Sequence, residues 1–121
     1  MLTFFDTNLL VYLFDRAQPA KREQARRRFI AEVEAGRFVT STQVLQEFYV
    51  VVTRKLAVAL RPEEAEDALR SLAELHIAPV DVALILQAAV RSRDMRVSFW
   101  DALIIETALA VGADCLLSED L

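Results

Sequence analysis

Short apolar runs alternate with longer amphipathic stretches along the whole chain. Apolar runs at 2–6, 37–41 and 113–118 predict strands, and the segment at 77–80 predicts a connector or a short strand. Amphipathic stretches predict helices over 8–15, 19–36, 43–57, 62–76, 81–95 and 99–111. Because strands alternate with helices and no hairpin signal is present, we expect a parallel sheet sandwiched between helices.

Composition limits the size and environment of this fold. The 121 residues suffice for one domain, and 55% of them are hydrophobic, which suggests more apolar surface than one small core needs. We therefore expect a homodimer or another bound partner. No apolar run reaches the roughly 18–20 residues of a membrane span. The single cysteine, Cys115, excludes an internal disulfide, is expected in the core of the last strand, and suits a cytoplasmic protein.

Two acidic residues follow predicted strands. Asp6 comes directly after the apolar start of "FFDTN", and Asp120 follows the last strand in "LLSED". The carboxyl ends of parallel strands meet at one edge of a sheet, where α/β proteins build ligand sites. Two simpler interpretations remain open: Asp6 could be an ordinary helix cap, and Asp120 a solvated residue near the chain end with Glu119 as its rival.

Two further acidic residues lie on predicted helices. Glu47 has no Lys or Arg three or four positions away, so no local ion pair is expected. Asp101 shares a predicted helix face with Ile104 and Ala108, where an ionised carboxylate is costly unless it is paired or binds a metal. Ser98 offers a simpler role for Asp101, since the two could form a capping box. Most of the other acidic residues, including Glu32, are expected on solvated helix surfaces.

A cluster of these carboxylates would need a counter-charge. Two carboxylates about 4 Å apart repel each other by roughly 4 kcal/mol at an effective dielectric constant of 20. Three or four together are tolerable only with bound protons or a cation. Oxygen ligands without His or Cys select Mg²⁺, or Mn²⁺, rather than Zn²⁺.

Four short motifs carry a resemblance to a known family. In order and spacing, "FFDTN", "QVLQEF", "SFWDALIIETA" and "LLSED" resemble the motifs of PIN-domain ribonucleases, and among them the VapC-type toxins of bacterial toxin–antitoxin pairs. The resemblance implies a single PIN domain over 1–121 with a three-layer α/β/α sandwich around a central parallel sheet. It also implies a catalytic quartet, two principal metal ligands within it, and supporting polar residues. The quartet is Asp6, Glu47, Asp101 and Asp120; the metal ligands are Asp6 and Asp101; the supporting residues are Thr7 or Asn8, and Ser118.

The resemblance further implies an activity and partners. Such a protein would be a Mg²⁺-dependent endoribonuclease that uses one or two ions to hydrolyse RNA, forms a homodimer and is silenced by an antitoxin protein. Family members usually continue through a further short strand, so we expect the carboxyl end of this chain to be incomplete.

Basic and apolar side chains suggest where RNA and partners would bind. The net charge of −4 gives no general attraction to nucleic acid, so binding must rest on local patches. Arg91, Arg93 and Arg96 precede the Asp101 helix and are the preferred phosphate contacts, whereas the basic cluster at 21–28 is expected on a solvated face. The apolar residues at 9–14 and in the next helix could line an antitoxin groove, pack on the sheet, or form the dimer seam.

Other functions fit less well. An aspartyl-phosphate phosphatase would need a second Asp two residues after Asp6, and position 8 is Asn. A receiver-like domain would need a late Lys, and none follows Lys55. A catalytically idle PIN-fold interaction module remains the alternative to an enzyme.

Overall fold

The computed structural model describes residues 1–118, in which a parallel sheet forms the centre of the molecule. Its strands are β1 (Thr3–Phe5), β2 (Phe38–Ser41), β3 (Ile77–Ala78) and β4 (Cys115–Leu117). They lie in the order β3-β2-β1-β4, and every neighbouring pair is parallel. The parallel sheet predicted from the sequence is therefore confirmed, and the segment at 77–80 contributes a short strand.

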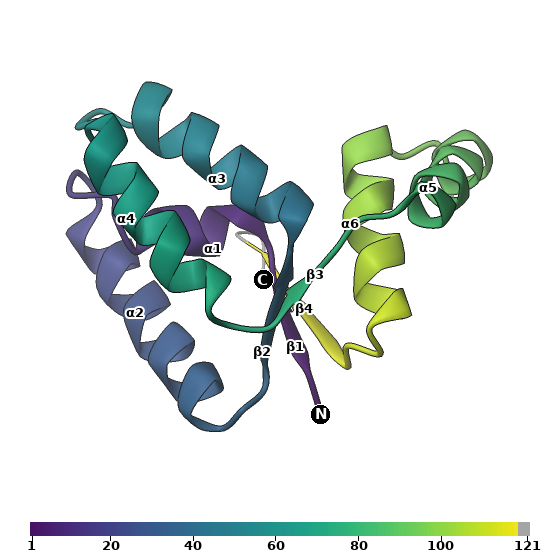
Figure 1. Ribbon diagram of the computed structural model, residues 1–121, viewed down its shortest axis with the longest axis horizontal. Coiled ribbons are helices and arrows are strands. Elements are labelled where there is room, and N and C mark those ends of the chain that lie inside the picture. Colours follow the sequence, from purple (N-terminus) through teal and green to yellow (C-terminus); the bar gives the residue numbers. More distant parts are fainter. Residues whose placement is uncertain (119–121) are drawn as a thin grey trace.

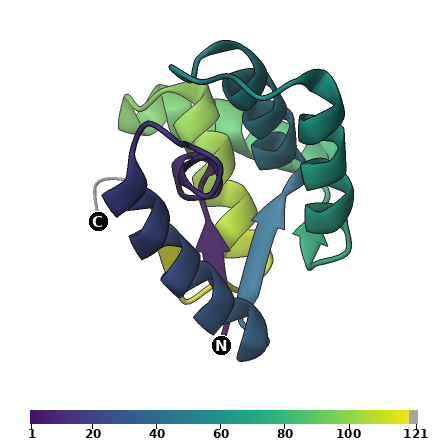
Figure 2. The same ribbon diagram turned by 90° about the vertical axis from the view of Figure 1, so that its left-hand side faces the viewer.

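Helices cover both faces of the sheet. Figure 1 shows four of them on one face: α1 (Thr7–Tyr12), α2 (Pro19–Glu34), α3 (Thr42–Arg54) and α4 (Pro62–Ala73). The other face is covered by α6 (Phe99–Ala110), and α5 (Val82–Met95) packs against α6; both lie behind the sheet in Figure 2. This arrangement confirms the three-layer α/β/α sandwich.

Helices α1, α3 and α4 each end three residues earlier than their periodicity predicts. After α1, the backbone N–H groups of Leu13 and Phe14 donate three residues back, to Leu10 and Val11, at 3.2 and 3.0 Å. After α4, Leu75 donates in the same way to the residue three positions earlier. Tightened last turns of this kind satisfy the carbonyl groups at a helix end. The apolar pattern continues past each helix because these turns still pack against the core.

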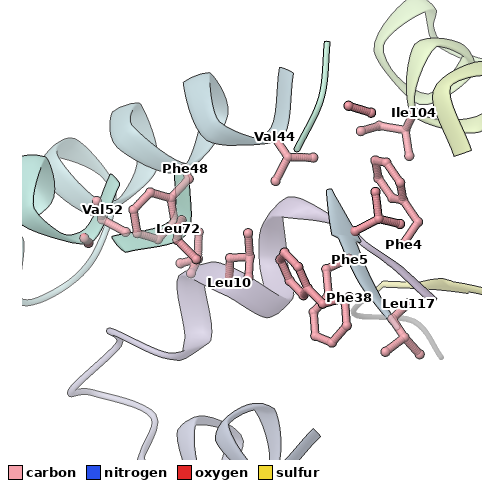
Figure 3. Packing of buried hydrophobic residues seen from close by; sticks show 14 of the residues in the cluster. Phe4, Phe5, Leu10, Phe38, Val44, Phe48, Val52, Leu72, Ile104 and Leu117 are labelled. Atoms are coloured by element: carbon pink, nitrogen blue, oxygen red, sulfur yellow. The ribbon is translucent and has the colours of Figure 1, made fainter. Parts of the chain in front are cut away.

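The main core fills the space between the sheet and α1–α4. Figure 3 shows Phe5 and Phe38 side by side in this core, and their rings lie 4.9 Å apart. Phe48 of α3 is fully buried, and Ile104 of α6 closes the core from the other face. Every residue of β1 and β2 is buried, as expected for parallel strands covered on both sides.

A smaller second core lies between α5 and α6. It consists of Leu84 and Ala88 of α5 with Ala102 and Leu103 of α6. The main core and the second core therefore share α6, which contributes residues to both.

Exposed apolar side chains gather on α5 rather than on the early helices. Leu10 is fully buried, and the other large side chains of the first two helices mostly pack against the main core. For these residues the structure therefore supports packing on the sheet. In contrast, Val82, Leu86 and Met95 of α5 are between 62% and 70% exposed. No helix within residues 1–118 is both long and apolar enough to cross a membrane.

Two residues lie in surroundings that the sequence did not predict. Glu32 was expected on a solvated surface but is buried, because the Arg37 and Arg28 guanidinium groups cover its carboxylate and donate hydrogen bonds to it. The bond from Arg37, helped by the one from Arg28, lowers the pKa of Glu32. Cys115 was expected in the core but is exposed, since it begins the edge strand β4.

Candidate active site

Asp6 lies where β1 ends and α1 begins. Its backbone N–H donates to the carbonyl oxygen of Leu117 at 2.9 Å, which continues the pairing of β1 with β4 and places Ser118 beside it. The pairing with β2 places Ser41 on the other side. Asp6 Oδ1 also accepts a hydrogen bond from the Thr7 backbone N–H at 2.7 Å and caps α1. The two interpretations of Asp6 thus hold together: it is a helix cap and stands at the carboxyl edge of the sheet.

Glu47 lies one turn into α3 and is held by a neighbour on the same helix. Gln43 Nε2 donates to Glu47 Oε1 at 2.9 Å and to the backbone carbonyl oxygen of Trp100 at 3.2 Å. Both partners are acceptors, so the amide nitrogen must face them. Gln43 is only 4% exposed, and its side chain joins α3 to the first turn of α6.

Asp101 is exposed in the first turn of α6, which corrects the expectation that it lies on the buried face. Ile104 and Ala108 do face the main core. Asp101 stands in the first turn of the helix, one turn before Ile104, and its side chain is exposed although Ala102 and Leu103 beside it are buried in the second core. Ser98 caps this turn, since its Oγ accepts from the Asp101 backbone N–H at 3.0 Å.

The three carboxylates influence one another electrostatically. Burial raises the pKa of Asp6, and the charge of Asp101 raises it further against the lowering effect of the Thr7 N–H. Burial also raises the pKa of Glu47; the hydrogen bond from Gln43 lowers it, and the charges of Asp6 and Asp101 add to the rise. Within residues 1–118, none of the three forms an ion pair. The structure therefore brings them to one end of the sheet, and no cationic side chain in the described part of the chain pairs with them.

The oxygen atoms at this edge fit a hard cation. In the described part of the chain, no three Asp, Glu, His or Cys side chains converge closely enough to hold a metal ion by themselves. Mg²⁺ does not require this, because it keeps several waters and is usually bound through one or two carboxylates. The Thr7 hydroxyl oxygen is buried next to Asp6, and this side chain helps to lower the pKa of Asp6 against the larger effect of burial. These oxygen ligands thus suit Mg²⁺ or Mn²⁺, with water molecules as the remaining ligands of the ion.

The remaining acidic and polar candidates lie near this edge or outside the described residues. Ser118 follows β4 and is half-buried beside Asp6, whereas Asn8 is exposed in α1. Asp120, the fourth predicted member of the quartet, and its rival Glu119 lie outside the described residues.

The predicted phosphate contacts differ in their surroundings. Arg91 forms an ion pair with Glu106, and Arg93 forms one with Asp94 at 2.8 Å. Arg96 ends α5 in a left-handed conformation with φ 54°, and among residues 1–118 it forms no ion pair. Two of the three guanidinium groups are thus already engaged by carboxylates.

Comparison with known families identifies the fold. The family model of the PIN domain matches residues 3–121. The chain belongs to the PIN-domain family. No curated protein sequence shows significant similarity to this PIN domain.

Solved structures share the architecture of this PIN domain at low sequence identity. The VapC20 toxin of Mycobacterium tuberculosis, which cleaves the sarcin-ricin loop, is 22% identical with a TM-score of 0.67, over 94% of this chain and 86% of that one. A toxin–antitoxin complex from Klebsiella pneumoniae is 18% identical with a TM-score of 0.69, over 95% and 84%. VapBC2 from Rickettsia felis, bound to a promoter DNA fragment, is 18% identical with a TM-score of 0.70, over 97% and 86%. At these identities the likeness establishes the shared fold.

Sequence reasoning missed two residues of the site in this PIN domain. Gln43 stands four positions before Glu47, a spacing at which amide and carboxylate side chains meet on a helix, and this signal could have been used. Trp100 directly precedes Asp101 and is the only tryptophan of the chain. Its contact with Gln43 could not be predicted, because it depends on how α3 and α6 are placed across the end of the sheet.

Proposed function

We propose that this PIN domain is a metal-dependent endoribonuclease and the toxin of a toxin–antitoxin pair. The observation that carries the proposal is the set of carboxylates at the carboxyl edge of the sheet: Asp6 and Glu47, half-buried with raised pKa values, beside Asp101 and without a basic partner in the described residues. Such a set is costly to fold and is typical of a site that binds a cation. Family membership supports the same activity.

Each carboxylate has a distinct role in this proposal. Asp6 and Asp101 would hold Mg²⁺ or Mn²⁺, which would supply charge stabilisation at the phosphodiester and a more acidic water. Glu47 orients the attacking water and accepts its proton, because its raised pKa makes it a stronger base than an exposed glutamate. Gln43 keeps the Glu47 carboxylate turned toward the first turn of α6. Asp120 would complete the quartet by positioning a second water or ion.

The partners follow from the proteins that share the fold. VapC20 cleaves the sarcin-ricin loop, an argument for an RNA substrate here. The structure from Klebsiella pneumoniae is a toxin–antitoxin complex and that from Rickettsia felis is VapBC2, an argument for an antitoxin protein that silences this chain. The exposed apolar side chains of α5 support a homodimer, which light scattering of the purified protein would detect.

Cleavage of RNA under controlled metal conditions tests the activity. The wild-type protein is expected to cleave with Mg²⁺ or Mn²⁺ and to stop in excess chelator. Asp6→Asn and Asp101→Asn should each lower the rate by about 100-fold or more, because each removes a charged group at the reacting centre. Asp114→Asn is the matched control, since this exposed carboxylate binds the Leu2 N–H at the opposite end of the sheet.

Two outcomes would contradict the proposal. Cleavage that persists in chelator, or that is equal in the wild type and in Asp6→Asn, would show that the carboxylates are not the reacting centre. A folded wild-type protein that binds a co-encoded partner but cleaves no RNA with either metal would instead be an interaction module.

A further inference from the structure

A hollow of about 310 Å³ lies beside the carboxylates, between α3 and the first turn of α6. Glu47 forms part of its wall, Val50 and Val51 provide apolar surface, and Lys55 and Trp100 contribute a cation and an aromatic ring. Its volume falls at the lower end of the range for ligand sites, roughly 300–1,000 Å³. The hollow is therefore continuous with the proposed active site and differs from it in chemistry.

Trp100 is unusually accessible for a tryptophan. It is 62% exposed, although tryptophan is on average a highly buried residue. Its position is nevertheless fixed: the backbone carbonyl accepts the hydrogen bond from Gln43, and the ring makes an edge contact with Phe99 at 5.2 Å between centroids. An aromatic ring that is anchored and exposed is suited to stacking against a ligand.

The charges around the hollow favour a nucleobase over a phosphate next to Trp100. Glu47 is negative when ionised and would repel a phosphate group, whereas a base is neutral and has two π faces. Lys55 stands twelve residues beyond Gln43, roughly 18 Å along α3. Among residues 1–118 it forms no ion pair, so its ammonium group can meet the backbone of a strand that follows the helix.

We propose that this hollow is a subsite for one unpaired base of the RNA substrate, which stacks on Trp100 while the adjoining phosphate lies at the metal ion that Asp6 and Asp101 would hold. The inference rests on the proposed ribonuclease function and adds to it a base-binding residue, Trp100, beside the carboxylates. A base inside a duplex has both faces covered by its neighbours, so the subsite selects nucleotides in loops or single strands. Because Trp100 directly precedes Asp101, stacking also sets the distance from the bound base to the carboxylates.

The first experiment uses the fluorescence of Trp100, which reports on this position alone because the chain has no other tryptophan. The Asp6→Asn protein, which should bind without cleaving, is titrated with a single-stranded oligoribonucleotide and with a duplex of the same sequence. Saturable quenching by the single strand and much weaker quenching by the duplex is the expected result. Equal quenching by both, or none by either, would overturn the subsite.

The second experiment compares cleavage by Trp100→Ala, Trp100→Phe and the control Leu109→Ala. Base–aromatic stacking free energies correspond to a fall in kcat/KM of about 5- to 150-fold for Trp100→Ala. Phenylalanine should recover most of the loss because it still offers a π face. Leu109 is a suitable control because it is 59% exposed on the same helix and is not part of the hollow.

The outcomes separate this inference from the function on which it rests. A wild-type protein without metal-dependent cleavage contradicts the ribonuclease, while single-strand quenching would still support the base subsite. Wild-type cleavage rates in Trp100→Ala, together with lost binding of a protein partner, would make Trp100 a partner contact and overturn the subsite. If Trp100→Ala is poorly folded by circular dichroism, then Trp100→Phe and the quenching experiment decide.

Discussion

The bridge made by Gln43 gives the sharpest test of how the site is held together. Replacing Gln43 with Met keeps a long unbranched side chain of similar size but removes both hydrogen bonds. Glu47 then loses its donor, and α3 loses its polar link to the Trp100 carbonyl group in α6. The same change also removes the Gln43 Oε1 atom, which is buried without a partner among residues 1–118.

The two lost hydrogen bonds lower the free energy of unfolding, and removal of the unsatisfied oxygen raises it. The net loss of stability is therefore small. The bond to the charged Glu47 and the bond to the carbonyl group together contribute about 2–4 kcal/mol, taking the lower part of the range because Glu47 is half-exposed. Removal of the unsatisfied oxygen returns about 1–3 kcal/mol. We therefore expect Gln43→Met to lower the free energy of unfolding by only about 1 kcal/mol.

The effect on cleavage should be larger and should depend on pH. The hydrogen bond from Gln43 lowers the pKa of Glu47, so its loss raises that pKa further. Glu47 then becomes ionised at higher pH, and the acidic limb of the pH–rate profile shifts to higher pH. The destabilisation should shrink at acid pH, because a protonated Glu47 no longer needs the donor.

Urea unfolding and a pH–rate profile check both parts of this prediction. Gln46→Met is the matched control: Gln46 is exposed, lines the same hollow, and its side chain makes no hydrogen bond in residues 1–118. If Gln43→Met lowered the free energy of unfolding by more than about 3 kcal/mol, removal of the unsatisfied oxygen would not offset the lost hydrogen bonds, and the prediction would be wrong. An unchanged acidic limb in Gln43→Met would refute the role of Gln43 in positioning and charging Glu47.

Two further predictions concern carboxylates whose pKa the fold shifts, Asp6 upward and Glu32 downward. Because the pKa of Asp6 is raised in the folded protein, its ionisation costs stability as pH rises; Asp6→Asn should melt higher than wild type in chelator at pH 7, and the gain should vanish below about pH 4. Asn also caps helices well, so a lower melting temperature at pH 7 would contradict this. Glu32→Gln should cost about 1–2 kcal/mol at pH 7 in urea unfolding, since Glu32 has a lowered pKa, and the cost should fade as pH falls through that pKa. An equal loss in Glu34→Gln, an exposed neighbour on the same helix, would show that the two arginines are not the cause.

Local sequence patterns were enough to predict the α/β/α layers of the fold and the position of much of the candidate site. Apolar runs and amphipathic stretches determined the order of strands and helices, and parallel strand order then placed Asp6 at the carboxyl edge of the sheet. The prediction for Asp101 located its helix correctly but not its exposure. Periodicity gives the direction of a helix face and not where along the helix the core ends.

Features that depend on distances between elements were beyond the sequence. The contact of Gln43 with Trp100 spans two helices whose relative position is set by packing on the sheet. Burial of Glu32 requires Arg37, which lies after the end of its helix. The ion pair of Arg91 with Glu106 joins α5 to α6 and could not be inferred from either helix alone.

The sharing of α6 by two cores has a consequence for local unfolding. Ile104 and Ala108 attach this helix to the main core, whereas Ala102 and Leu103 attach it to α5, which packs chiefly against α6. Helix α5 can therefore open as a cooperative unit of its own, at a free energy below that of global unfolding. Such an opening leaves Asp101 on a helix still joined to the sheet but supported on one side only. Amide hydrogens of α5 would exchange before those of the sheet, and changes in the second core would affect turnover more than the midpoint of denaturation.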